Sequence, residues 1–363
     1  MKPIVTFGEI LGRISPPGHL RFPQAMPGTV GFTFAGAEAN VAASVAYLGG
    51  SARFVTALPE NDISRACLAS LRKLGVDVSP ILFTDEGRLG IYYTETGANQ
   101  RPGRVIYDRE HSAISLTPAA RYDWASVFKD AGWLHVTGIT PALGKTAAET
   151  TIRATEEAKK HGLTVSCDLN FRAKLWKWDP DLKPAESAGK TMRAILPQVD
   201  ILVANEEDAA SVLGIEPDDN DVEGGKLNIQ GYESVAIRIA KQFPGLKAIA
   251  TTFRESISAS HNNWGAMLFD CSEQRAYYAP QRDGRYAPYP ITHIVDRVGG
   301  GDSFAAGLIF ALNTPDLNSP QDAVSFATAA SCLAHSISGD FNFTTRSEVE
   351  SLMKGSSSGR VVR

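Results

Sequence analysis

The sequence predicts an α/β protein of three layers, in which a mostly parallel, doubly wound β-sheet lies between two sets of helices. Short apolar runs alternate with helical patterns along the chain, as expected when each parallel strand is followed by a crossover helix. The 363 residues are 43% hydrophobic, which is enough for a substantial core. A polar segment, Asp168–Arg172, directly follows one apolar run, where the ligand crevice of such a sheet is found.

The elements of this fold can be assigned in chain order. The runs predicted to form buried strands are Ile4–Ile10, Ala52–Leu58, Trp133–Thr137, Thr164–Asp168, Ile201–Ala204 and Leu246–Thr251. Helical patterns lie between most of these runs, at Asp62–Leu74, Thr146–His161 and Glu206–Leu213.

Two regions interrupt the alternation. Residues 13–34 are rich in proline and glycine, so composition alone predicts an irregular loop there. Arg88–Glu95 and Arg104–Arg109 resemble strands joined by a turn, which predicts a hairpin. Further along, the acidic insert 216–231 is expected to be a surface loop, and the polar, glycine-rich tail 353–363 is expected to be flexible.

Composition excludes several classes of protein. The net charge is −4, whereas a general nucleic-acid-binding surface needs a basic excess. The four cysteines contain no Cys-x-x-Cys pair, so neither a zinc site nor a disulfide framework is expected. No signal peptide precedes the first strand, and no apolar run reaches the length of about 18 residues that a membrane span needs. We therefore expect a cytoplasmic protein without a membrane or nucleic-acid partner.

A glycine run near the C-terminus is the most informative segment. Gly299, Gly300 and Gly301 precede Asp302, and a helix-forming run, Ser303–Leu312, follows. Backbone N–H groups at such a helix start can converge on a phosphate. A carboxylate beside a phosphate can then act as a base on an attacking hydroxyl. An ordinary turn followed by a helix cap would explain this segment equally well.

A second signal lies far away in the sequence. The segment Phe34–Gly50 reads as a turn and an alanine-rich helix that ends at two glycines, with Asn40 in its first turn. Together with the Asp302 loop, this segment resembles the two signatures of the ribokinase-like (PfkB) family of carbohydrate kinases. Ala35-Gly36 stands where the family has Gly-Gly, and Arg297-Val-Gly-Gly300 stands where it has Thr-x-Gly-Ala.

The resemblance covers about Ile4 to Leu352 and has structural implications. It implies one ribokinase-like domain over residues 1–352, with a small β-sheet lid formed by segments at about 13–34 and 88–113. It also implies that Gly36 and Asn40 bind sugar hydroxyls. Asp302 would be the catalytic base, with Gly299–Gly301 as the anion hole.

Residues of the expected sugar pocket indicate the class of substrate. Arg13 stands where related kinases commonly carry an aspartate that binds neutral sugars. Tyr92, Tyr107 and Arg109 fall on the expected lid, and Arg172 follows a strand. Guanidinium groups can bind a carboxylate through two parallel hydrogen bonds. The set therefore resembles the 2-keto-3-deoxygluconate kinases of the family, with Tyr92, Tyr107, Arg109 and Arg172 holding the sugar carboxylate.

The nucleotide side carries weaker signals. Asn205-Glu-Glu-Asp208 resembles the family's Asn-x-x-Glu element, which implies that Asp208 binds Mg²⁺ through water, although its side chain is one methylene shorter than glutamate. Acidic residues at a helix start are an alternative explanation. Thr251 and Ser256 stand where the family places its nucleotide-contacting strand, and Gly299 and Gly301 are expected to contact phosphates. The resemblance also leaves open a monovalent cation.

These observations predict an ATP-dependent sugar-acid kinase that acts on the terminal hydroxyl of 2-keto-3-deoxygluconate and forms the 6-phosphate, with ATP and Mg²⁺ as cofactors. Another sugar kinase of the family, such as a fructokinase or a 5-dehydro-2-deoxygluconate kinase, is the nearest alternative. A sugar-acid-binding protein without activity is a third, but binding alone does not require Asp302. We also expect a homo-oligomer.

Overall fold

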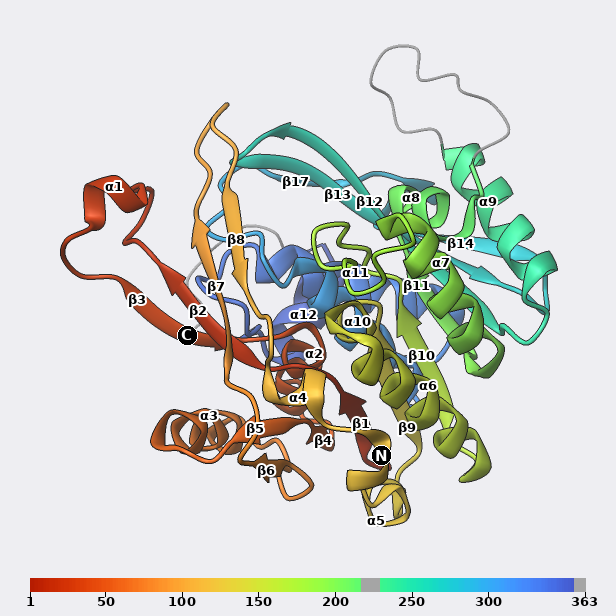
Figure 1. Ribbon diagram of the computed structural model, residues 1–363. Helices are drawn as coiled ribbons and strands as arrows, with labels where there is room; N and C mark the ends of the chain where they lie inside the picture. The colour runs from red at the N-terminus through yellow and green to blue at the C-terminus, as the bar shows by residue number, and fades with distance from the viewer. Residues whose placement is uncertain (217–228, 356–363) are drawn as a thin grey trace.

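The computed structural model describes residues 1–216 and 229–355. Residues 217–228 and 356–363, which include most of the predicted acidic loop and tail, lie outside the described residues. In the described part a nine-stranded sheet forms the centre of the molecule (Figure 1). Its strands are, from one edge to the other, β14 (Arg275–Ala279), β13 (His261–Asp270), β12 (Ala248–Ser258), β11 (Ile201–Ala204), β10 (Thr164–Asp168), β9 (Trp133–Thr137), β1 (Ile4–Phe7) and β4 (Ala52–Val55), with β17 (Tyr289–Ile291) paired to β13.

The sheet is parallel from β4 to β12, and β13, β14 and β17 are antiparallel. Both faces of the parallel part are covered. Along β1, Ile4 belongs to the apolar core on one face and Val5 to the core on the other, because successive side chains point to opposite sides of a strand. The predicted three-layer α/β fold is therefore confirmed.

Helices cover the two faces of the sheet as separate sets (Figure 1). One core contains residues of α2 (Ala37–Tyr47), α3 (Asp62–Lys73), α10 (Gly300–Leu312), α11 (Pro320–Ala334) and α12 (Arg346–Met353). The other core contains residues of α4 (Ala113–Leu116), α5 (Trp124–Phe128), α6 (Lys145–Lys160), α7 (Pro184–Ile195) and α9 (Ile229–Gln242). Short helical turns lie at Ala119–Arg121, Thr140–Leu143 and Leu196–Gln198.

The predicted small β-sheet lid is present as a separate four-stranded sheet. Its strands are, in order, β3 (Gly31–Ala35), β2 (Leu11–Ser15), β7 (Gly90–Glu95) and β8 (Arg104–Asp108), and α1 (Phe22–Ala25) lies in the connection between β2 and β3. Composition alone predicted an irregular loop over residues 13–34, and this was wrong for two stretches that pair as strands β2 and β3. Strand β2 also pairs with β7, which is distant in sequence.

Several predicted elements differ in extent, three of them markedly. The run Ala52–Leu58 is divided into β4 and β5 (Ala57–Pro59), and β5 pairs with β6 (Leu82–Thr84) in a separate sheet. The predicted helix Glu206–Leu213 is a turn, α8 (Glu206–Asp208), that continues as a π-helix over Ala209–Leu213. Strand β12 continues seven residues past Thr251 and forms a long hairpin with β13.

The tip of the β12–β13 hairpin reaches the lid. The backbone N–H of Ala259 donates to the carbonyl of Asn99 at 2.7 Å, and the N–H of Asn99 donates to the Ser260 hydroxyl at 3.0 Å. The hairpin and the lid therefore meet above the carboxyl ends of the central strands (Figure 1). A smaller hairpin, β15 (Gln281–Arg282) with β16 (Arg285–Tyr286), follows β14.

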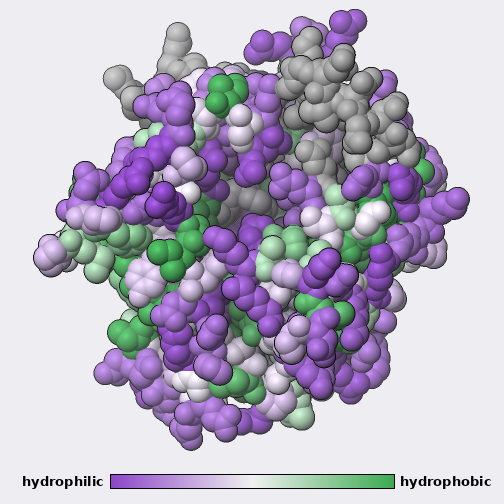
Figure 2. Space-filling model, turned by 45° about the horizontal axis from the view of Figure 1, so that its top comes forward, coloured by the Kyte–Doolittle hydropathy of each residue, from purple (hydrophilic) through white to green (hydrophobic). Residues whose placement is uncertain are grey.

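The surface that includes this region is mainly polar. Figure 2 shows hydrophilic side chains over most of the visible face, with apolar side chains in small separate groups. Such scattered apolar exposure is normal for a folded protein. Within the described residues, no helix combines the length and the apolar character that a membrane crossing needs.

Candidate active site

A cavity of about 840 Å³ lies where the central strands end, between the sheet, the lid and the start of α10. Twelve of the fourteen residues that the sequence proposed as site residues line it: Gly36, Asn40, Tyr92, Tyr107, Arg109, Arg172, Asn205, Asp208, Gly299, Gly300, Gly301 and Asp302. They come from segments up to about 260 positions apart in the chain. The fold thus brings both signature segments to one place.

Two predicted nucleotide contacts, Thr251 and Ser256, are not among the lining residues, whereas Thr252 is. Side chains alternate along β12, so Thr251 points to the face opposite that of Thr252. Ser256 lies on the same face as Thr252 but four residues further along the strand, where its partner across the hairpin, Asn262, lines the cavity instead.

The glycine loop is shaped by close contacts. Gly299 has a φ of +82°, and a Cβ there would lie 2.5 Å from the carbonyl oxygen of Asp340, so only glycine fits without strain. Helix α10 begins at Gly300, which leaves first-turn N–H groups without helical partners. A Cβ on Gly301 would meet no atom within 4 Å. The loop therefore presents N–H donors and free space to the cavity, as phosphate binding requires.

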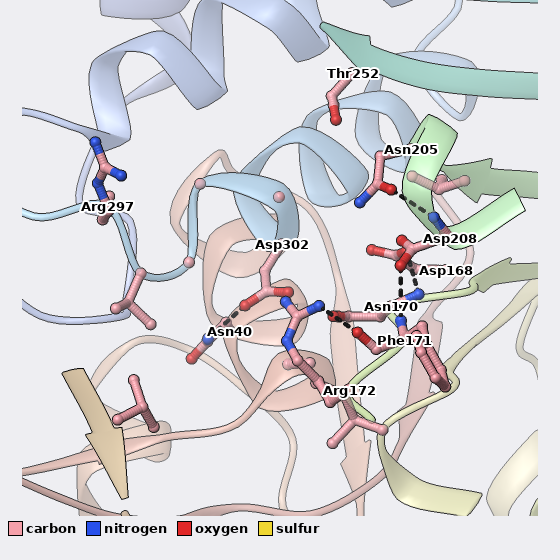
Figure 3. Close-up of a pocket in the computed structure, with 18 of the residues that line it drawn as sticks. Asn40, Asp168, Asn170, Phe171, Arg172, Asn205, Asp208, Thr252, Arg297 and Asp302 are labelled. Atoms are coloured by element: carbon pink, nitrogen blue, oxygen red, sulfur yellow. Dashed lines mark hydrogen bonds between the residues drawn. The ribbon is translucent and has the colours of Figure 1, made fainter. Parts of the chain in front are cut away.

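Asp302 lies in the first turn of α10 and faces Asn40 of α2 (Figure 3). The Asn40 amide Nδ2 donates to Asp302 Oδ2 at 2.7 Å. Burial raises the pKa of Asp302 to about 6, while the hydrogen bond from Asn40 and the charge of Arg172 oppose this rise. A carboxylate with this pKa is ionised at neutral pH and can still accept a proton, so Asp302 is suited to general-base chemistry.

Two further carboxylates line the cavity beside Arg172 (Figure 3). Asp168 Oδ1 accepts the N–H of Asn170 at 3.1 Å, and Asp208 Oδ1 accepts the N–H of Phe171 at 3.1 Å. Burial raises the pKa of Asp208 to about 6. Burial, together with the charges of Asp208 and Asp302, also raises the pKa of Asp168. A nearby cation would stabilise the ionised forms of these two carboxylates and lower their pKa values.

This donor set fits a magnesium ion held partly through water. Carboxylate oxygens are the ligands that Mg²⁺ prefers, and Mg²⁺ commonly binds through one or two carboxylates together with waters and substrate phosphates. Asp208 and Asp168 supply such oxygens on the cavity wall. A site made of protein side chains alone is not present, since no group of three or more His, Cys, Asp or Glu residues suited to a metal was found in the described part of the chain.

Arg13, which indicated the substrate class, and two side chains expected to bind the sugar carboxylate, Tyr92 and Arg109, have partners within the protein. Arg13 is buried and donates to Asp340 Oδ1 at 2.7 Å and to Asp296 Oδ2 at 2.5 Å. The Tyr92 hydroxyl donates to the Asp340 carboxylate at 2.8 Å. The interpretation of Arg13 as a group available to a sugar acid is therefore wrong, because Arg13 neutralises two buried carboxylates and does not line the cavity.

Arg109 is partly engaged in the same way. Its Nε donates to Glu9 Oε2 at 2.6 Å and its Nη2 lies 2.5 Å from the same oxygen. This contact uses one edge of the guanidinium group, and the group still lines the cavity above the Tyr107 ring, with 5.7 Å between the guanidinium carbon and the ring centroid. Arg172 lies near Asp302, since its charge opposes the rise in the pKa of that carboxyl (Figure 3), and its Nη1 donates to the Phe171 carbonyl at 2.9 Å.

The sequence reasoning assigned no role to several lining residues, among them Asp340, Asp168, Thr252 and Arg254. Asp340 follows Gly339 near the end of the described chain, and no local pattern marks it. Asp168 ends a predicted strand, and this position was a usable signal.

Comparison with known proteins places the chain in a family. Residues 1–238 match the pfkB family carbohydrate kinase pattern. The chain is 31% identical to the 2-dehydro-3-deoxygalactonokinase of Haloferax volcanii over 98% of each protein. It is also similar to the crystal structure of 2-dehydro-3-deoxygluconokinase from Thermotoga maritima, with 42% identity, a TM-score of 0.87 and coverage of 98% and 100% of the two chains. Fructokinase-1 of Oryza sativa subsp. japonica is 26% identical over 88% of each chain. The protein therefore belongs to the pfkB family of carbohydrate kinases.

Proposed function

We propose that this kinase transfers the γ-phosphoryl group of ATP to the terminal hydroxyl of 2-keto-3-deoxygluconate and forms 2-keto-3-deoxy-6-phosphogluconate. The observation that carries the proposal is the position of Asp302, which follows the glycine loop and faces Asn40 in a cavity that guanidinium groups also line. The relatives with the highest similarity reported above act, by their names, on acids of this type.

In the proposed reaction, Asp302 takes the proton from the 6-hydroxyl while that oxygen forms a bond to the γ-phosphorus. The bond between the γ-phosphorus and the bridging oxygen breaks, and ADP leaves with the electron pair. The first-turn N–H groups after Gly299 stabilise the charge on the transferred group. Arg172, which lies beside Asp302, is positioned to contact the same group. Mg²⁺, held by Asp208 and Asp168, would offset the charge of the triphosphate.

The sugar carboxylate lies at the other end of the substrate from the reacting hydroxyl. We assign it to the free edge of the Arg109 guanidinium and the Tyr107 hydroxyl, which lie on the lid side of the cavity. A hydrogen bond to a charged group contributes about 1.5–3 kcal/mol. Preference for a sugar acid over a neutral ketose of similar size should therefore be about 10- to 150-fold in kcat/KM.

The test is an ADP-release assay with 2-keto-3-deoxygluconate, its C4 epimer 2-keto-3-deoxygalactonate, and D-fructose. We expect the two acids to be used and fructose to be used poorly, and Tyr107→Phe to weaken use of the acids without a matching loss for fructose. A preference for fructose would refute the sugar-acid assignment and favour fructokinase activity.

The galactonate epimer is a second candidate, because the Haloferax volcanii relative covers nearly the whole chain and is named for it. The ratio of kcat/KM values for the two epimers decides between them. The cytoplasmic location, the homo-oligomeric state and a monovalent-cation requirement stay predictions.

A further inference from the structure

Two guanidinium groups on the hairpin side of the cavity have no carboxylate partner among the described residues. Arg254, on β12, is exposed and lines the cavity. Arg297, just before the glycine loop, donates from Nη2 to the carbonyls of Ser258 at 3.3 Å and Ala259 at 3.0 Å, both of which are neutral. Burial and the nearby charge of Arg254 lower the pKa of Arg297. The carboxylate next to it in sequence, Asp296, is bound to Arg13.

Two buried N–H donors lie beside these arginines. Asn262 is 1% exposed and Trp264 is 5% exposed, and both line the cavity. Neither the Asn262 Nδ2 nor the Trp264 Nε1 has an acceptor in the described part of the protein. Asn262 is oriented by Arg297, because its Oδ1 accepts from the Arg297 Nη2 at 3.3 Å. Trp264 pairs with Arg254 across the hairpin.

All four groups are donors or cations, and a buried donor without an acceptor destabilises a protein by about 1–3 kcal/mol. An anion would satisfy both unpaired N–H groups and would also reduce the repulsion between the two guanidinium groups. The arrangement therefore has the chemistry of an anion-binding subsite, separate from the N–H groups of the glycine loop.

The position of this subsite indicates which anion it takes. Arg297 precedes Gly299 by two residues, and Arg254 follows Thr252 by two residues on the same face of β12. In Figure 3 the Arg297 side chain points away from Asp302 and Asn40. The residues proposed to bind the sugar come from α2 and the lid. The subsite therefore adjoins the glycine loop that would hold the transferred phosphoryl group, and its side chains come from β12, β13 and the segment before α10.

We infer that Arg254 and Arg297, together with the Asn262 amide and the Trp264 indole N–H, bind the phosphates of the donor nucleotide that are not transferred. The inference rests on the proposed use of ATP and assigns the residues that recognise its α- and β-phosphates. The subsite holds these phosphates in ADP as well as in ATP, so it contributes to product affinity and not only to catalysis.

The experiment is titration calorimetry of ADP and of adenosine against the wild type and against Arg254→Ala, Arg254→Lys and Arg297→Lys, without sugar. Loss of one charged contact corresponds to about a 10- to 150-fold rise in the ADP dissociation constant. We expect a rise in this range for Arg254→Ala and a smaller one for the two lysine variants. Adenosine affinity should change less than threefold, and KM for ATP should rise while KM for the sugar acid stays the same.

Arg275→Ala is the matched control, because Arg275 lies on β14 of the same sheet and does not line the cavity. Thermal unfolding of each variant checks that it folds. If the wild type binds ADP and Arg254→Ala binds it equally well, the subsite is refuted while ATP use stands. A rise in KM for the sugar acid instead of ATP would assign the two arginines to the sugar carboxylate and also refute it. If the wild type binds no ADP, the proposed donor and this subsite both fail.

Discussion

Replacing Asn40 by alanine should raise the pKa of Asp302, the proposed catalytic base. The Asn40 amide donates to Asp302 Oδ2 at 2.7 Å and stabilises the ionised form. With this hydrogen bond in place, burial raises the pKa of Asp302 to about 6. A hydrogen bond to a charged group contributes about 1.5–3 kcal/mol, and one pKa unit corresponds to about 1.4 kcal/mol. Because Asp302 is only half-buried in a cavity open to water, we take the lower value, a rise of about one unit.

The assay is the pH dependence of kcat/KM. Asp302 must be ionised to accept a proton, so activity falls as pH drops through its pKa, and a higher pKa moves this decline to higher pH. The midpoint should move from about 6 to about 7, so that at pH 6.5 the ionised fraction falls about threefold. Asn205→Ala serves as control, because Asn205 lines the cavity but bonds the N–H of Asp208. An unchanged midpoint in Asn40→Ala, whatever its activity at high pH, would refute the assignment of Asp302 as the titrating base.

Three other outcomes are expected. Asp302→Asn should lower kcat by about 10²- to 10⁴-fold with little change in substrate affinity, and near-normal turnover would remove this residue from the mechanism. Arg172→Ala should lower kcat for the sugar acid and for a neutral acceptor alike, since Arg172 lies beside Asp302, whereas a selective rise in KM for the acid would return Arg172 to the carboxylate. Glu38 accepts hydrogen bonds from Thr137 and Thr140 on one oxygen only, and burial raises its pKa to about 7. A raised carboxyl pKa makes the folded state bind more protons, so the free energy of unfolding should fall by about 3 kcal/mol as pH rises from about 4.5 to 7. Glu38→Gln should lack this part of the pH dependence, and denaturant unfolding at pH 5 and pH 8 measures the difference.

The central sheet could be predicted from sequence because each of its parallel strands is a continuous apolar run. Both faces of such a strand are buried, so the pattern survives without any knowledge of its neighbours. The lid strands lack this property. Along β8 the side chains alternate between exposed and half-buried, and β2 and β3 lie within a proline- and glycine-rich stretch, so only their pairing makes them strands.

Some residues of the candidate site could likewise be predicted from sequence, and others could not. The glycine loop and Asn40 could be found because each belongs to a local motif. The choice between Thr251 and Thr252 depended on which face of β12 meets the cavity, and one residue of register decides that. The partners of Arg13 and Arg109 could not be found from sequence, because Asp340 is 327 residues from Arg13 and Glu9 is 100 residues from Arg109.

The contacts of Arg13 limit how the substrate preference of this protein can change in evolution. Related kinases commonly carry an aspartate at this position, but Arg13→Asp alone would place a third carboxylate beside Asp296 and Asp340. Removing one partner of a buried ion pair costs about 3–5 kcal/mol, a large share of the stability of a typical domain. Asp296 also accepts the backbone N–H groups of Arg297 and Val298, so it is constrained by the glycine loop. An accessible route to a neutral-sugar pocket would therefore begin with a change at Asp340, and only afterwards at Arg13.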